Sequence, residues 1–146
     1  MAREVLGVGQ VRIHSGSVPK EEALREAADI LEAAGAVTSE YFDAMQQREQ
    51  AVSTYMGGEL AIPHGTNETN HTILDTALSF VRYDGGIDWD GDRVTFVIGI
   101  AGKGDEHLEV LSHIALVFAD PDEVERLKTP STPEDLYEML MATVEE

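Results

Sequence analysis

The sequence predicts an α/β fold, a single-domain sandwich in which helices flank a mixed β-sheet. Segments with helical periodicity alternate with short runs rich in β-branched and aromatic residues, and no internal repeat or linker separates them. A chain of 146 residues suits one domain, residues 1–146, which buries roughly two thirds of its unfolded surface. We therefore expect one compact core, and it forms without disulfides because the chain has no cysteine.

The first predicted elements are a strand and a helix. Residues 10–14 alternate in polarity as a strand does, and residues 15–17 offer turn and cap residues. Apolar side chains recur at helical spacing after Pro19, and Gly35 is expected to end this helix as its C-terminal cap.

A second helix is expected after Thr38 or Ser39, either of which can cap it. Arg48 falls in its last turn, where a cation complements the helix dipole. The large side chains expected on its inner face are Tyr41, Phe42 and Met45.

The second half of the chain predicts two strands and then helices. Residues 76–83 and 93–101 are β-rich, and residues 84–92 are predicted to join them as a long loop. Residues 109–119 predict a helix that ends near Pro121, and a last helix is expected to begin around residues 132–135.

One histidine lies in a setting that favours its display at the surface. Residues 60–62 predict a short buried strand, and Pro63 ends it because proline cannot donate to a sheet ladder. Gly65 lets the chain leave without a Cβ beside the ring. We therefore expect His64 at a strand end with its ring exposed, although a histidine that only caps a turn would fit the same dipeptide.

The charge of the chain restricts its partners. With 28 acidic and 10 basic residues the net charge is -18, which repels nucleic acid and anionic lipid and favours basic partners. The same excess could serve solubility alone. No apolar run is long enough for a membrane span and no signal peptide is visible, so we expect a cytoplasmic protein.

Three motifs resemble cofactor or metal sites and fail on spacing. The glycine-rich residues 99–104 lack the first glycine and the final hydroxyl of a phosphate loop. The aspartates of residues 88–92 lack the later glycine and glutamate of a calcium loop. His107 and His113 do not have the spacing of metal ligands on one helix face. We therefore expect neither a cofactor nor a metal.

What remains is a set of residues suited to phosphoryl chemistry: His64, Arg48 and His107. An imidazole titrates near neutrality, so its free nitrogen can act as a nucleophile and form a labile phosphoramidate. Arg48 could supply a forked donor to phosphoryl oxygens and His107 a second donor. Spacing alone does not bring them together, because Arg48 could only compensate the helix dipole and His107 could only cap or pack.

Four ordered motifs resemble one protein family. The strings REQAVSTYMG (residues 48–57) and LAIPHGT (residues 60–66) are similar to the IIA components of the bacterial phosphoenolpyruvate-dependent sugar phosphotransferase system, mannitol/fructose type. GIDWDG (residues 86–91), and VIGIAGK (residues 97–103) running into EHL, resemble the mannitol-specific branch. The likeness extends over about residues 20–118.

The resemblance implies a role for each candidate residue. His64 matches the phosphoacceptor, Arg48 the active-site arginine and His107 the second active-site histidine. It also implies a mixed sheet flanked by helices, phosphoryl transfer from the carrier protein HPr to Nε2 of the acceptor, and delivery to a cysteine of the IIB domain of a mannitol permease. Two alternatives stay open at this stage: a fructose-type IIA, and a regulatory IIA-like module whose phosphorylation state is sensed by a partner.

Overall fold

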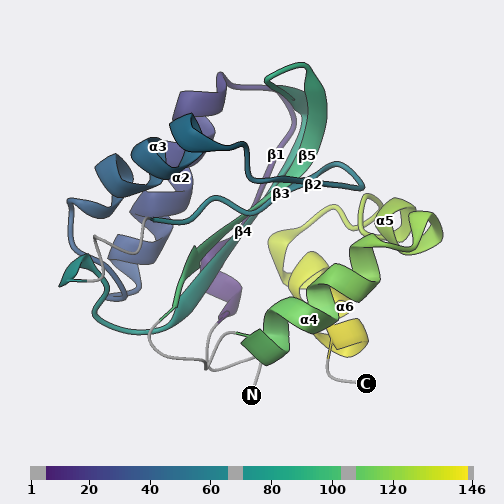
Figure 1. Cartoon of the computed structure of the whole chain (residues 1–146). Helices are drawn as coiled ribbons and strands as arrows, with labels where there is room; N and C mark the ends of the chain where they lie inside the picture. The colour runs from purple at the N-terminus through teal and green to yellow at the C-terminus, as the bar shows by residue number, and fades with distance from the viewer. Residues whose placement is uncertain (1–5, 66–70, 103–107, 145–146) are drawn as a thin grey trace.

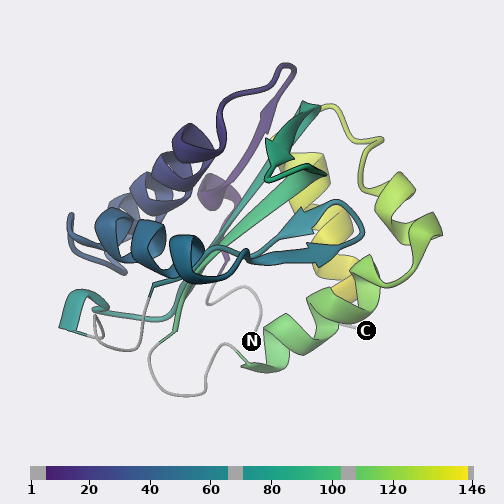
Figure 2. The same cartoon turned by 45° about the horizontal axis from the view of Figure 1, so that its top comes forward.

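The structure, a computed structural model, describes residues 6–65, 71–102 and 108–144, and it confirms the predicted fold class. The elements in chain order are η1 (Val8–Gln10), β1 (Val11–His14), α2 (Lys20–Ala33), α3 (Tyr41–Ala51), β2 (Tyr55–Gly57), β3 (Leu60–Ala61), β4 (Ala77–Trp89), β5 (Asp92–Ala101), α4 (Leu108–Phe118), α5 (Pro121–Arg126) and α6 (Pro133–Val144). The strands form one mixed sheet in the order β1-β4-β5-β3-β2. Helices α2 and α3 lie on one side of it, and α4, α5 and α6 lie on the other (Figure 1, Figure 2).

The two long strands form the centre of the sheet. β4 and β5 are antiparallel, while β1 runs parallel to β4 and β3 runs parallel to β5. β2 adds antiparallel to β3 at the edge. Because helices cover both faces, β4 and β5 carry apolar residues at successive positions instead of alternating with polar ones.

The sheet divides the core into two clusters. Leu78 and Phe80 of β4 pack with the side chains of α4 and α6, whereas Val81 and Tyr83 pack with those of α2 and α3. Successive strand residues point to opposite faces, so one strand supplies both clusters. The single compact core that the sequence predicts is therefore two apolar layers with the sheet between them.

The prediction of a long loop at residues 84–92 is wrong, because the two strands extend through most of this segment. β4 extends through Trp89, and β5 begins at Asp92. The register shifts between Arg82 and Ile87, where Gly86 adopts a φ of +74°, a conformation that glycine reaches without a steric penalty. The Asp-Gly dipeptide at residues 90–91 then makes the hairpin turn, with positive φ at both residues.

The structure confirms one predicted helix end and corrects two helix starts. Gly35, just past α2, has a φ of +79°, as a glycine after a helix end often does. Pro19 and Glu40 hold the N-cap positions of α2 and α3, and neither makes a side-chain cap bond. Thr38 forms a turn before α3 instead, since its hydroxyl and carbonyl accept from the backbone N–H groups of Glu40 and Tyr41.

Among the described residues, no helix combines the length and apolar character that crossing a membrane would require.

Candidate functional site

His64 lies where the short strand β3 ends beside β5. Its backbone forms an isolated parallel bridge with Ile100, and the carbonyl of Pro63 accepts the Ile100 N–H at 3.0 Å. The predicted strand-end position is therefore observed, although the residue is half-buried and not fully exposed. β5 holds the backbone on the N-terminal side of His64 and so fixes the direction in which the ring leaves the sheet.

One ring nitrogen of His64 is already bonded within the protein. Nδ1 lies 2.8 Å from the carbonyl oxygen of Ile62. A carbonyl only accepts, so Nδ1 carries the proton of the neutral ring and Nε2 keeps the lone pair. The bond also restrains rotation of the ring. The arrangement thus presents Nε2 as a nucleophile at a fixed position.

The chain just after His64 is joined to β5 through the hydroxyl of Tyr41, the first residue of α3. This hydroxyl donates to the carbonyl of Ile100 at 2.5 Å and accepts the backbone N–H of Gly65 at 2.9 Å. Tyr41 is 1% exposed, and burial raises its pKa to about 12 although the Gly65 N–H acts in the opposite direction. The hydroxyl is therefore protonated at neutral pH and makes both bonds.

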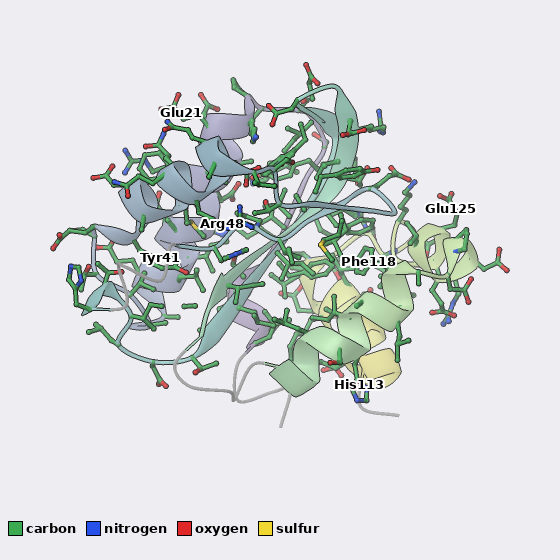
Figure 3. All side chains as sticks on the ribbon, viewed as in Figure 1. Glu21, Tyr41, Arg48, His113, Phe118 and Glu125 are labelled. Carbon is green, nitrogen blue, oxygen red and sulfur yellow. The ribbon has the colours of Figure 1, made fainter. Side chains whose placement is uncertain are left out.

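Arg48 lies in the last turn of α3, as predicted, at the end of the helix that leads toward β2 (Figure 3). One guanidinium nitrogen, Nη1, donates to the carbonyl of Val52 at 2.6 Å. This bond anchors the side chain at the helix end, where it is half-buried. A guanidinium has five N–H groups, so this contact leaves donors with which Arg48 can bind an anion.

Glu49, the residue after Arg48, is buried and fixes the end of α3. One of its carboxylate oxygens accepts the Thr54 N–H at 2.9 Å and the Trp89 Nε1–H at 3.0 Å, and the other accepts the Thr54 hydroxyl at 2.5 Å. Lys20 Nζ lies 3.1 Å from the same carboxylate. Burial would raise the pKa of Glu49, but the bonds from Thr54 and the ammonium of Lys20 outweigh it and hold the pKa below its usual value.

This network continues to the candidate nucleophile. The carbonyl of Thr54 accepts the Ile62 N–H at 3.1 Å, and the carbonyl of Ile62 in turn bonds Nδ1 of His64. The segment that holds the histidine and the helix end that holds Arg48 are thus joined through Glu49 and Thr54.

The sequence does not predict the roles of Tyr41 and Glu49. It places Tyr41 only on the packed face of its helix and gives no role to Glu49. The phenol of Tyr41 could have indicated a role, because a buried hydroxyl needs a hydrogen-bond partner. Nothing in the sequence indicates that Glu49 is buried, since a glutamate next to an arginine in a helix is usually exposed.

His107 lies outside the described residues, so the structure does not place it. The preceding strand is informative nonetheless. β5 passes His64 at Ile100 and ends at Ala101, so the backbone leaves the sheet beside the histidine on its way to α4.

An apolar groove adjoins the His64 segment. It has a volume of about 340 Å³ and lies between the β2–β3 hairpin and α4. Met56, Leu60 and Ile62 line one side, and Leu111 and Phe118 are among the residues that line the other. Met56 is 57% exposed, so an apolar side chain borders the groove at the surface. Figure 2 shows α4 running alongside this hairpin.

Fold and site together define an α/β protein in which a strand-end histidine, bonded through Nδ1, adjoins an apolar groove and is joined by hydrogen bonds to the helix end that carries an arginine. The chain belongs to the family of the phosphoenolpyruvate-dependent sugar phosphotransferase system, EIIA 2, whose model matches residues 4–142. Proteins of this family transfer phosphoryl groups between components of that system, so the chain is a phosphotransferase component.

Curated relatives and solved structures agree with this assignment. The mannitol-specific phosphotransferase enzyme IIA component of Halalkalibacterium halodurans is 39% identical over 140 residues, which are 96% of this chain and 97% of that protein. The Staphylococcus aureus protein of the same name is 42% identical over 120 residues, covering 82% and 83%. The crystal structure of IIA mannitol from Escherichia coli is 33% identical, with a TM-score of 0.82 over 92% of this chain and 97% of that one.

A further solved structure contains a related chain together with a partner. It is the complex of enzyme IIAMTL and phosphorylated enzyme IIBMTL from Escherichia coli. The likeness to this chain has 31% identity and a TM-score of 0.84, and covers 94% of this chain and 99% of that one.

Proposed function

We propose that this chain is a phosphoryl relay for mannitol uptake, accepting a phosphoryl group from phospho-HPr on His64 and passing it to a cysteine of a mannitol IIB domain. The observation that carries the proposal is the bond from Nδ1 of His64 to the Ile62 carbonyl, which leaves Nε2 as the nucleophile. The similarity to mannitol-specific IIA components supports the choice of sugar.

In the proposed transfer every bond to phosphorus that forms is matched by one that breaks, and no cofactor is needed. The lone pair of Nε2 attacks the phosphorus of phospho-HPr, and the bond from phosphorus to the donor nitrogen breaks as its electron pair returns to the donor imidazole. A cysteine thiolate of IIB then attacks the same phosphorus, and the bond to Nε2 of His64 breaks. Each transfer exchanges one bond to phosphorus for another, so the protein mainly positions the groups and stabilises the equatorial oxygens.

Arg48 and His107 are proposed as the groups that stabilise those oxygens. The structure supports the role of Arg48, since a fixed helix end holds it and one contact to the Val52 carbonyl uses only part of its fork. His107 is proposed from its match to the second active-site histidine of the family.

The apolar groove beside Ile62 is proposed as the surface where HPr and IIB dock in turn. Ile62, which lines the groove, precedes His64 by two residues in the chain. A partner bound in the groove would therefore bring its reacting atom close to Nε2. The net charge of -18 favours basic partners, and the related Escherichia coli chain forms a complex with phosphorylated IIB. This function implies a cytoplasmic location and a single IIA domain spanning residues 1–146.

We expect the purified protein to take up one phosphoryl group from phosphoenolpyruvate only when enzyme I and HPr are both present. Intact-mass measurement of complete and incomplete mixtures checks this. The label should be lost in mild acid, because phosphohistidine hydrolyses there. Labelling by ATP alone, or an acid-stable label, would overturn the relay proposal.

The phosphorylated protein should drive phosphorylation of mannitol when it is mixed with membranes that carry a mannitol IIB and IIC pair. Fructose membranes assayed in parallel should respond more weakly. Equal or faster transfer through the fructose permease would favour the fructose-type alternative. Phosphoryl uptake without transfer to either sugar would favour a regulatory module.

A further inference from the structure

The backbone on the C-terminal side of His64 departs from a regular parallel ladder with β5. In a parallel ladder, the strand that pairs with Ile100 would accept its N–H before His64 and donate to its carbonyl after His64. The first bond is made by the Pro63 carbonyl. At the second position, the Gly65 N–H and the Ile100 carbonyl are both bonded to the hydroxyl of Tyr41.

Tyr41 therefore connects a helix to the segment that carries His64. It begins α3, the same helix whose last turn holds Arg48. Its ring is fixed in the core and its hydroxyl both accepts and donates, which no apolar side chain of similar shape can do. With β3 only two residues long, little other sheet structure holds His64 in place.

We infer that Tyr41 is a positioning residue, whose hydroxyl holds the backbone on the C-terminal side of His64 so that Nδ1 stays on the Ile62 carbonyl and Nε2 faces the phosphoryl donor. The inference rests on the proposed function for the role of Nε2. Tyr41 acts through the backbone of Gly65 and Ile100 and makes no contact with the phosphoryl group. By holding this backbone it keeps the ring where the Ile62 carbonyl fixes its tautomer and direction.

The test is Tyr41→Phe, which removes the hydroxyl and keeps the ring. Loss of the two hydrogen bonds that this hydroxyl makes predicts a fall in kcat for phosphoryl uptake of about five- to a hundredfold. KM for phospho-HPr should not change, because the docking surface is untouched. In nitrogen-15 spectra of the unphosphorylated protein, the fraction of His64 protonated on Nδ1 should fall.

Tyr83→Phe is the matched control. Tyr83 is also buried, and its hydroxyl donates to Glu26 at 2.5 Å, but it lies on β4 away from His64. This variant loses the hydroxyl and its bond to Glu26, and it should keep the wild-type kcat and His64 tautomer. Equal losses of kcat in both variants, or a wild-type kcat and tautomer in Tyr41→Phe, would overturn the inference.

Two of the measurements keep the inference testable when the labelling assay or the variant fails: the His64 tautomer and hydrogen exchange of the Gly65 amide. The tautomer needs no phosphoryl donor, so it tests Tyr41 even if the wild-type protein fails to accept phosphate from HPr and the proposed function falls. If Tyr41→Phe does not fold, the Gly65 amide of the wild-type protein is measured by hydrogen exchange. Protection like that of the amides within β5 would support the bridge, and exchange at the rate of an open loop would contradict it.

Discussion

His64→Ala is expected to abolish phosphoryl uptake from phospho-HPr. It removes the nitrogen proposed to bond phosphorus, whereas Arg48 and His107 are proposed only to stabilise the transferring group. The fold should persist, since His64 is half-buried and the backbone bond that ties its segment to β5, from the Ile100 N–H to the Pro63 carbonyl, does not involve its side chain. Intact-mass measurement after incubation with phosphoenolpyruvate, enzyme I and HPr checks the loss, and circular dichroism checks the fold.

His107→Ala and His113→Ala provide the comparison. His107→Ala should slow labelling and not prevent it, because it removes one of the donors proposed to stabilise the transferring group. His113, a half-buried residue of α4, has no proposed part in transfer, and its replacement should leave the rate unchanged. Labelling that survives in His64→Ala but disappears in His107→Ala would show that the two histidines are assigned the wrong way round.

Much of the fold follows from local patterns in the sequence. Helical spacing of apolar residues predicts α2 and α3, and the dense β-branched runs predict the central strands β4 and β5. The edge strand β2 was not predicted, because Tyr55–Gly57 is too short for a periodic pattern and ends in glycine. Asp-Gly at residues 90–91 is a strong turn signal, but it falls within the loop predicted over residues 84–92, so the hairpin was not predicted.

The candidate site was predictable only where its chemistry is local. The Pro-His-Gly sequence around residue 64 carries its own signal, because each neighbour restricts the backbone in a known way. Tyr41 and Glu49 could not be found in this manner. The hydroxyl of Tyr41 bonds a carbonyl 59 positions along the chain, and Glu49 bonds an indole 40 positions along. Only tertiary structure brings such pairs together.

Glu49 supports the proposed site although it has no proposed contact with the phosphoryl group. Its carboxylate is satisfied by donors from the Thr54 loop, Trp89 of β4 and Lys20 of α2. These contacts fix the end of α3, where Arg48 lies, against the sheet that positions His64. The helix end that carries Arg48 is therefore held to the core that positions His64.

Arg48→Ala should lower the rate of phosphoryl uptake on the order of 10² to 10³-fold, the usual cost of losing one preorganised donor to a developing charge. Arg48→Lys should recover only part of the rate, because an ammonium keeps the charge but not the fork that binds two oxygens.

Arg126→Ala is the matched control, because it removes the same charge from the last turn of α5. Arg126 is exposed, and within the described residues its side chain pairs only with Glu123. Rapid-quench labelling measures all three variants, and thermal melting shows whether the folds remain comparable. A wild-type rate in Arg48→Ala would remove Arg48 from the site, and full rescue by lysine would mean that charge alone, without the fork, stabilises the transferring group.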